Sequence, residues 1–154
     1  MEQNTPRFED GKSLLIAGSR ARYQFADVAG IAAQWHAFGP HIGHIPGQVG
    51  SNTYGVCCNF DGQGSFDYIC GVEVESFSPL PGEWSRIRLA PQRYAVFAHT
   101  GHISTIKSTW DGIFQWLPQS GYTASAAPQF EIYTEAFDQV TGNGGLEIWI
   151  PIRQ

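Results

Sequence analysis

Residues 146–152 read Leu-Glu-Ile-Trp-Ile-Pro-Ile, and this stretch decides the class of fold. Leu and Ile alternate with Glu147, Trp149 and Pro151, which is the period-two pattern of a β-strand. One face of this strand is a continuous aliphatic ridge, so we expect it to pack against helices. We expect the opposite face, with Glu147 beside Trp149, to point toward any ligand cleft.

A second strand is predicted over residues 130–137, and a polar loop with three glycines joins it to the final strand. Its acidic and aromatic side chains also share one face, because successive side chains of a strand point to opposite sides. The residues on that face are Glu131, Tyr133, Glu135 and Phe137. Two neighbouring strands therefore each present carboxylates beside aromatic rings.

An amphipathic helix is predicted upstream of these two strands. Apolar residues recur at helical spacing from Ile103 to Leu117, and Pro118 ends the pattern. Residues 94–99 before this helix read as a strand, and a turn at Thr100-Gly101 joins the two. The second half of the chain thus has the order strand, helix, strand, strand.

The first half of the chain has the same order. Its helix pattern runs from Val28 to Phe38, with Asp27 near the start and Gly39-Pro40 at the end. A hairpin turn rich in glycine is predicted at residues 61–65. The predicted strands of this half cover residues 13–23, 53–60 and 66–75.

The sequence therefore predicts an α+β fold built as a tandem repeat of two βαββ units. Trp35 and Trp110 hold matching places in the middle of the two helices, which indicates a repeat offset of about 75–79 residues. Two such units would form an antiparallel sheet with both helices on one face. A ligand groove is then expected at the pseudo-twofold junction.

We expect a single domain over residues 1–154. Its pseudo-repeats are predicted at about 8–77 and 84–154, with residues 78–83 as the linker between them. The chain has 154 residues, 42% of them apolar and 15% charged, which suits one compact domain with a sizeable core.

Charge and hydropathy exclude several classes of function. The net charge is −5, and no short window is basic enough to follow a phosphate backbone, so we expect no direct nucleic-acid binding. No apolar run approaches the length of a membrane span or of a signal-peptide core. A soluble cytoplasmic protein is therefore expected.

The cysteines and histidines do not form a recognisable metal or redox motif. Cys57, Cys58 and Cys70 lack the spacing of a zinc site, and adjacent cysteines on a strand point to opposite faces, so we expect buried thiols. The pairs His41/His44 and His99/His102 fit hydrogen-bonding roles better than ligation. We predict no metal and no cofactor. Glycine-rich phosphate loops and serine-nucleophile elbows are also absent from the sequence.

A carboxylate among aromatic rings suits an amphipathic cation, because ring faces attract positive charge and a partly desolvated carboxylate needs a partner. The alternative is that Glu147 is a solvated residue of the outer face and that Trp149 covers a sheet surface. The helix residues Trp35, Phe38, Trp110 and Phe114 fit the core better than a ligand site. Trp116 and Trp84 are less easily assigned to the core, and they could line a pocket.

Four segments of the chain resemble the gyrase-inhibitor-like family, which is also described as the effector-binding domain of AraC-type transcription activators. They are Tyr94–Phe97, Ile113–Tyr122, Pro128–Tyr133 and Leu146–Ile152. The first half, with residues 54–56 and 67–74, is similar to integron cassette-encoded and stand-alone effector-binding proteins. The resemblance covers nearly the whole chain.

This resemblance implies a central groove that holds drug-like, often cationic and aromatic ligands. Glu147 matches the acid of the family's final strand, so it is expected to supply the counter-charge. The rings are expected from Trp149, Tyr133, Trp116, Tyr68 and Trp84. The chain has no helix-turn-helix region, so any control of transcription would act through a protein partner.

Two alternatives stay open at this point. Some proteins similar in fold hydrolyse reactive electrophiles, and Glu147 would then be the general base with Tyr133 or Trp149 as an orienting group. Resemblance to gyrase inhibitors also allows protein–protein inhibition. A binder releases its ligand unchanged, whereas a hydrolase turns it over.

Overall fold

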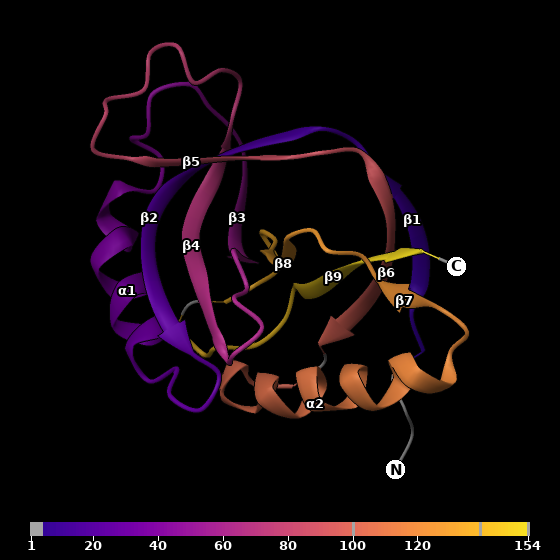
Figure 1. Ribbon diagram of the computed structural model, residues 1–154. Coiled ribbons are helices and arrows are strands. Elements are labelled where there is room, and N and C mark those ends of the chain that lie inside the picture. Colours follow the sequence, from indigo (N-terminus) through magenta and orange to yellow (C-terminus); the bar gives the residue numbers. More distant parts are fainter. Residues whose placement is uncertain (1–4, 100, 139, 154) are drawn as a thin grey trace.

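The structure is a computed structural model that describes residues 5–99, 101–138 and 140–153. A curled antiparallel sheet makes up most of it, and the two helices lie outside the curl, α1 at the left and α2 at the bottom of the view (Figure 1). The strands are β1 (Arg7–Gly11), β2 (Leu14–Gln24), β3 (Gln48–Cys58), β4 (Ser65–Val74), β5 (Ser85–Leu89), β6 (Gln92–His99), β7 (Thr123–Ala124), β8 (Gln129–Tyr133) and β9 (Leu146–Arg153). The helices are α1 (Gly30–Phe38) and α2 (Ile106–Trp116), with the short 3-10 turns η1 (Gly39–His41), η2 (Ile103–Thr105) and η3 (Leu117–Gln119).

The order of the strands is symmetric about the middle of the sheet. It runs β1-β6-β9-β8-β3-β4-β2-β5, with β7 paired to β9 outside this path. The units β2-α1-β3-β4 and β6-α2-β8-β9 therefore meet at the antiparallel pair β3 and β8. The predicted α+β class and the antiparallel sheet with both helices on one face are confirmed. The repeat boundaries at about 8–77 and 84–154 stay a prediction.

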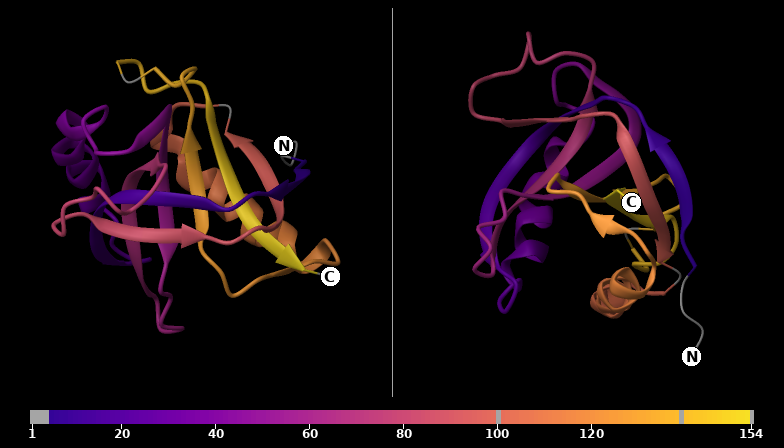
Figure 2. Two further views of the ribbon diagram at one scale, coloured as in Figure 1. Left: turned by 90° about the horizontal axis from the view of Figure 1, so that it is seen from above. Right: turned by 45° about the vertical axis from the view of Figure 1, so that its right-hand side comes forward.

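Each half of the sheet receives its edge strand from the segment that precedes the other half in the sequence. β1 precedes the first unit but pairs with β6 of the second unit. β5 precedes the second unit but pairs with β2 of the first unit. Figure 2 shows both crossings around the curled sheet. Because of this exchange, the two halves are tied together by backbone hydrogen bonds at both edges as well as at the junction.

Several predicted boundaries differ from the structure. β1, β5 and the two-residue β7 were not predicted, because such short strands carry too little alternation to stand out. The strand predicted over 130–137 ends at Tyr133, where the Phe137 amide donates to the Thr134 carbonyl and closes a turn. Helix α1 begins at Gly30, and its end continues into η1. The predicted turn at Thr100-Gly101 includes Thr100, which lies outside the described residues.

The core lies on both faces of the sheet. The inner face of the curl buries aliphatic and aromatic side chains around Tyr94 and Phe130. The outer face meets the helices in two clusters: Phe38 and Trp35 of α1 pack on β4, and Ile113 and neighbouring side chains of α2 pack on β6 and β9. The aliphatic side of β9 thus faces a helix, as its alternation predicts.

Candidate functional site

A buried carboxylate lies at the centre of the sheet, on the face that the helices cover. Glu131 sits in the middle of β8, opposite Gly55 of β3 on one side and Ile148 of β9 on the other. Only 6% of its surface is exposed. Isolated charges are rarely buried to this extent, because removing a carboxylate from water is costly unless its oxygens are hydrogen-bonded.

Three hydrogen bonds satisfy the oxygens of Glu131. The hydroxyl groups of Tyr68 and Tyr133 each donate to Oε1 at 2.9 Å. The Trp110 indole N–H donates to Oε2 at 3.0 Å. The donors come from β4, β8 and α2, so this site exists only when both halves of the chain are folded.

Helix α1 contributes a matching indole. The Trp35 N–H of α1 donates to the Tyr68 hydroxyl at 3.0 Å. Its ring also meets the Tyr133 ring edge-on, with centroids 5.1 Å apart. Gln34, the preceding residue, donates to the carbonyls of Ser19 and Tyr68 at 2.8 and 3.1 Å and so holds α1 above β4. The two mid-helix tryptophans of the sequence repeat are therefore both linked to Glu131, Trp110 directly and Trp35 through the Tyr68 hydroxyl.

Burial sets the protonation of this carboxylate. Desolvation raises the pKa of Glu131 above its usual range, while the hydrogen bonds from Trp110, Tyr68 and Tyr133 and the neighbouring His99 act in the opposite direction. Among the described residues, Glu131 forms no ion pair. The arrangement therefore offers hydrogen bonds to a carboxylate but no full positive charge in contact with it.

Gly55 makes room for this cluster. A Cβ atom at this position would lie 2.0 Å from the Tyr68 hydroxyl oxygen and 2.8 Å from Glu131 Oε1. Any side chain at position 55 would therefore displace the Tyr68–Glu131 hydrogen bond. The absence of a side chain is what allows the two groups to meet across β3.

The structure brings Tyr68 and Tyr133 of the predicted ligand residues together, but it separates them from Glu147 and Trp149. Glu147 and Trp149 lie opposite Ile132 and Phe130 on the inner face of the curl, away from the helices. Glu147 forms an ion pair with Arg7 at 2.8 Å, and it accepts the Trp149 indole N–H at 3.2 Å. The expectation of an acid without a partner is therefore not met at Glu147, because β1, which was not predicted, supplies the arginine.

The two remaining predicted residues occupy other surroundings. Trp116, at the end of α2, packs edge-on against Phe97 and stacks near Tyr122, with centroids 5.3 and 6.3 Å away. Trp84 packs edge-on against Phe38 and His41 at 5.8 and 4.9 Å. Trp116 thus lies at the C-terminal end of α2, and Trp84 packs against the C-terminal end of α1. Their predicted ligand roles stay untested.

The three cysteines lie on strands β3 and β4. Cys57, Cys58 and Cys70 are free, and burial raises the pKa of each thiol. No group of three or more potential metal-ligating side chains occurs among the described residues.

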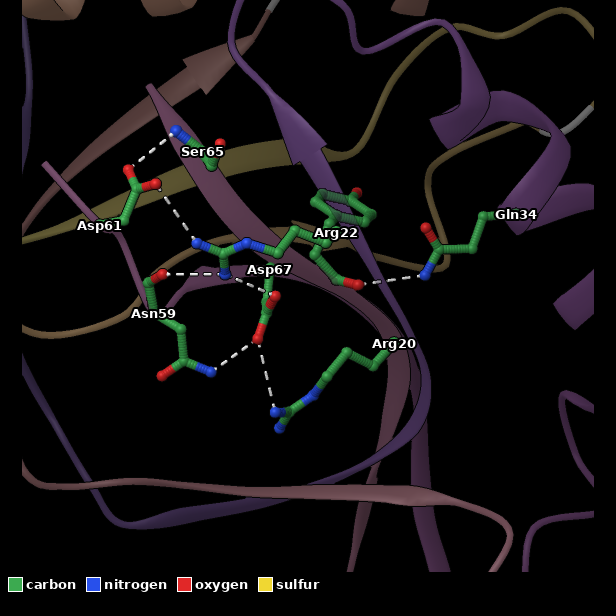
Figure 3. Close-up of polar contacts among 8 residues, drawn as sticks. Arg20, Arg22, Gln34, Asn59, Asp61, Ser65 and Asp67 are labelled. Carbon is green, nitrogen blue, oxygen red and sulfur yellow. Dashed lines mark hydrogen bonds and ion pairs between the residues drawn. The ribbon is translucent and has the colours of Figure 1, made fainter. Parts of the chain in front are cut away.

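The most conspicuous charged cluster joins β2 to the β3–β4 hairpin. Asp67 there accepts hydrogen bonds from Arg22 and Asn59 at 2.9 and 2.8 Å and pairs with Arg20 (Figure 3). Because Asp67 is already paired with Arg20 and Arg22, this cluster holds the β3–β4 hairpin against β2 and does not offer a free counter-charge.

The role of the indole donor can be tested without any ligand. In Trp110→Phe the ring is kept but the hydrogen bond to Oε2 is lost, so the pKa of Glu131 is expected to rise further. A ¹³C NMR titration of the glutamate side-chain carboxyls would measure it. Trp116→Phe, at the same helix but away from Glu131, is the control and should leave this titration unchanged. An unaltered Glu131 titration in Trp110→Phe would contradict the hydrogen bond.

Comparisons with known proteins agree with this architecture. The transcriptional regulator BrlR of Pseudomonas aeruginosa is 30% identical over 125 residues, which are 79% of this chain and 46% of BrlR. The chain thus spans about half the length of this relative. The structure of SAV2435 bound to tetraphenylphosphonium matches with a TM-score of 0.77 at 21% identity and covers 99% of this chain and 94% of SAV2435.

A third protein, the integron cassette protein VCH_CASS2 of Vibrio cholerae, matches with a TM-score of 0.75 at 20% identity, over 97% of this chain and 96% of that protein. At these identities the two structures show a shared fold. The family model of the GyrI-like small molecule binding domain matches residues 4–153, and the chain belongs to this family. The resemblance stated from the sequence is confirmed.

Among the described residues, none of the helices has the length and apolarity needed to cross a bilayer.

Proposed function

We propose that the site around Glu131 binds amphipathic organic cations, with this carboxylate as the counter-charge. The observation that carries the proposal is a carboxylate that is 6% exposed, has three hydrogen-bond donors and lacks an ion-pair partner among the described residues. A buried negative charge of this kind gains most from a cation that arrives already desolvated.

The donors around Glu131 narrow the class of cation. Three of roughly four acceptor positions of the carboxylate are already used, so little is left for a ligand that must itself donate hydrogen bonds. The rings of Tyr68, Tyr133, Trp35 and Trp110 supply apolar area and cation–π attraction. A lipophilic cation without N–H groups, with its charge spread over aryl rings, fits these surroundings best.

The relatives support the same class of ligand. The related fold of SAV2435 has been determined with tetraphenylphosphonium, which is a lipophilic cation of this type. BrlR is a transcriptional regulator, and its matched region is about half of its length. We therefore propose that this domain responds to a cationic effector. Tetraphenylphosphonium is the natural first probe.

Calorimetric titration with tetraphenylphosphonium tests the proposal, with neutral triphenylphosphine oxide as the comparison. A ligand of about 25 heavy atoms at about 0.3 kcal/mol each would bind with about 7.5 kcal/mol, a low-micromolar dissociation constant. Saturable binding of the cation and at least tenfold weaker binding of the neutral compound are expected. Equal affinities would contradict a counter-charge, and release of altered compound would favour the hydrolase alternative.

Tryptophan fluorescence should report the same event. Because Glu131 is almost fully buried, a ligand reaches its carboxylate only if a covering side chain moves, and the indoles of Trp35 and Trp110 are the covering groups that hydrogen-bond within the site. We therefore expect a saturable change in emission with the same midpoint as the calorimetric titration.

Affinity should depend on pH with a defined sign. Burial raises the pKa of Glu131, so below that pKa the carboxyl is neutral and offers no counter-charge. Tetraphenylphosphonium carries a fixed charge, so its affinity should fall about tenfold per pH unit below the pKa and level off above it. Titrations from about pH 4 to pH 8 in buffers of different ionisation enthalpy would also detect proton release on binding. A flat profile without proton release would contradict the role of Glu131.

A further inference from the structure

A cavity lies on the opposite side of the sheet from Glu131. It has a volume of about 340 Å³ and is bounded by β1 and the turn after it, together with inward-facing residues of β3, β4, β6, β8 and β9. Its lining includes Trp149 and Phe130, which pair across β8 and β9 on the inner face of the curl. This size is at the lower end of the range for small-molecule sites.

Aromatic rings form one wall of this cavity. The half-buried Trp149 ring stacks on Phe130 with centroids 5.5 Å apart and an interplanar angle of 19°. Tyr94 meets the same ring edge-on at 5.4 Å. The Trp149 N–H is held by Glu147, so the indole is fixed in orientation. A fixed indole backed by two buried rings presents a rigid surface for a flat apolar group.

Polar groups form the other wall. Glu73 of β4 lines the cavity beside Asn52 and Tyr54, and the charge of Glu73 adds to burial in raising the pKa of the Tyr54 hydroxyl. Glu9 and Asp10 also line the cavity, but each pairs with an arginine, Arg7 or Arg93. Glu73 forms no ion pair within the described part of the chain.

Glu9 and Asp10 are offset by their arginines, so Glu73 is the carboxylate of the lining without an ion pair among the described residues, and Lys12, which also lines the cavity, does not pair with it. Glu73 is therefore the group that a cationic ligand would meet. Unlike Glu131, whose oxygens already accept three hydrogen bonds, Glu73 accepts no side-chain hydrogen bond among those described, so its oxygens suit a group that donates N–H bonds.

We propose that this cavity is a second binding site, which takes a primary or secondary ammonium group joined to an aryl body. The ammonium lies against Glu73 and the Tyr54 hydroxyl, and the aryl group stacks on Trp149. This site is separate from the one around Glu131 because the sheet lies between them. It selects hydrogen-bonding amines, whereas the site around Glu131, which we call the helix-side site, selects cations without N–H donors.

The probe for this site is 2-phenylethylamine, with neutral 2-phenylethanol as its isostere. The five tryptophan indole N–H signals in a ¹⁵N NMR spectrum, assigned through single Trp→Phe variants, report which site responds. Saturable movement of the Trp149 signal, with the Trp35 and Trp110 signals unmoved, is the expected result. 2-Phenylethanol should bind at least tenfold more weakly.

Charge at position 73 gives the decisive comparison. Glu73→Gln should weaken 2-phenylethylamine about tenfold or more, because it removes a charge-assisted hydrogen bond, while tetraphenylphosphonium affinity stays within about twofold. Glu83→Gln removes the same charge on the loop between β4 and β5, outside the cavity lining, and should leave both affinities unchanged.

Three results would overturn the second site. They are movement of the Trp35 or Trp110 signal in place of Trp149, equal weakening by Glu73→Gln and Glu83→Gln, and no saturable shift with 2-phenylethylamine at all. None of them bears on tetraphenylphosphonium binding, so this inference and the proposed function can fail separately.

Discussion

Glu131→Gln is expected to weaken tetraphenylphosphonium binding by about 2–4 kcal/mol, or roughly 30- to 700-fold, because it removes one partner of a desolvated charge pair. Glutamine keeps the shape of the side chain and can still accept hydrogen bonds from Tyr68 and Tyr133 through its carbonyl. Its amide nitrogen would face the Trp110 N–H, so that hydrogen bond is lost as well, and the neutral ligand described below separates this loss from the loss of charge. Isothermal calorimetry at a pH above the pKa of Glu131 would measure it.

Two controls separate charge from shape in this experiment. The affinity for neutral triphenylphosphine oxide should change less than about threefold in Glu131→Gln, because no charge pair is lost. Glu147→Gln removes a carboxylate that is already paired with Arg7 on the other face of the sheet, and its effect on tetraphenylphosphonium should also be small. A large loss in Glu147→Gln with none in Glu131→Gln would contradict the role of Glu131. It would instead indicate Glu147 on the final strand as the counter-charge, as the sequence alone predicts.

Gly55→Ala is expected to destabilise the protein by about 2–5 kcal/mol and to abolish cation binding at the helix-side site. The new methyl group would occupy the position of the Tyr68 hydroxyl, which lies 2.0 Å from a Cβ built there. Either the strands separate locally or Tyr68 moves away and leaves Glu131 with one fewer donor. Both outcomes place strain or an unsatisfied oxygen in the core. Urea unfolding followed by tryptophan fluorescence would measure the free energy of unfolding.

Gly112→Ala is the matched control for that substitution. Gly112 lies inside α2, and a Cβ atom there would have no neighbour within 4 Å. The same glycine-to-alanine change should therefore stabilise the helix by about 0.5–1 kcal/mol through backbone entropy alone. An unfolding midpoint for Gly55→Ala that equals or exceeds that of the wild type would contradict the crowding at position 55.

Most of the fold could be predicted from periodicity, whereas the edges of the sheet could not. The two helices and six main strands follow from runs of regular apolar spacing, and the aliphatic face of β9 meets a helix as its alternation requires. β1 and β5 are five residues each, and their pairing is set by distant strands, so local pattern carries almost no information about them. Missing β1 also meant missing Arg7, the partner of Glu147.

The candidate site was predicted only in part for a related reason. Alternation along residues 130–137 places Glu131 and Tyr133 on one face, which the structure bears out, and the family resemblance added Tyr68 and Tyr133 as ring residues. Which of the two acidic faces lies under the helices depends on tertiary packing, and the pattern of β9 drew attention to Glu147 instead. The usable signal was the matching pair Trp35 and Trp110, since buried indoles need an acceptor for their N–H.

The exchanged edge strands also constrain how the chain can fold as it is synthesised. β1 leaves the ribosome early, yet its strand partner β6 follows only after the whole first unit and β5 have been made. The first unit in turn lacks its own edge until β5 arrives to pair with β2. Native contacts of such long sequence separation slow folding, because the loops they close must be ordered before any contact forms. In a nascent chain that stops before β6, strand β1 lacks its partner β6 and strand β3 lacks its partner β8. These strand edges are exposed during that interval, which is when chaperone protection matters most.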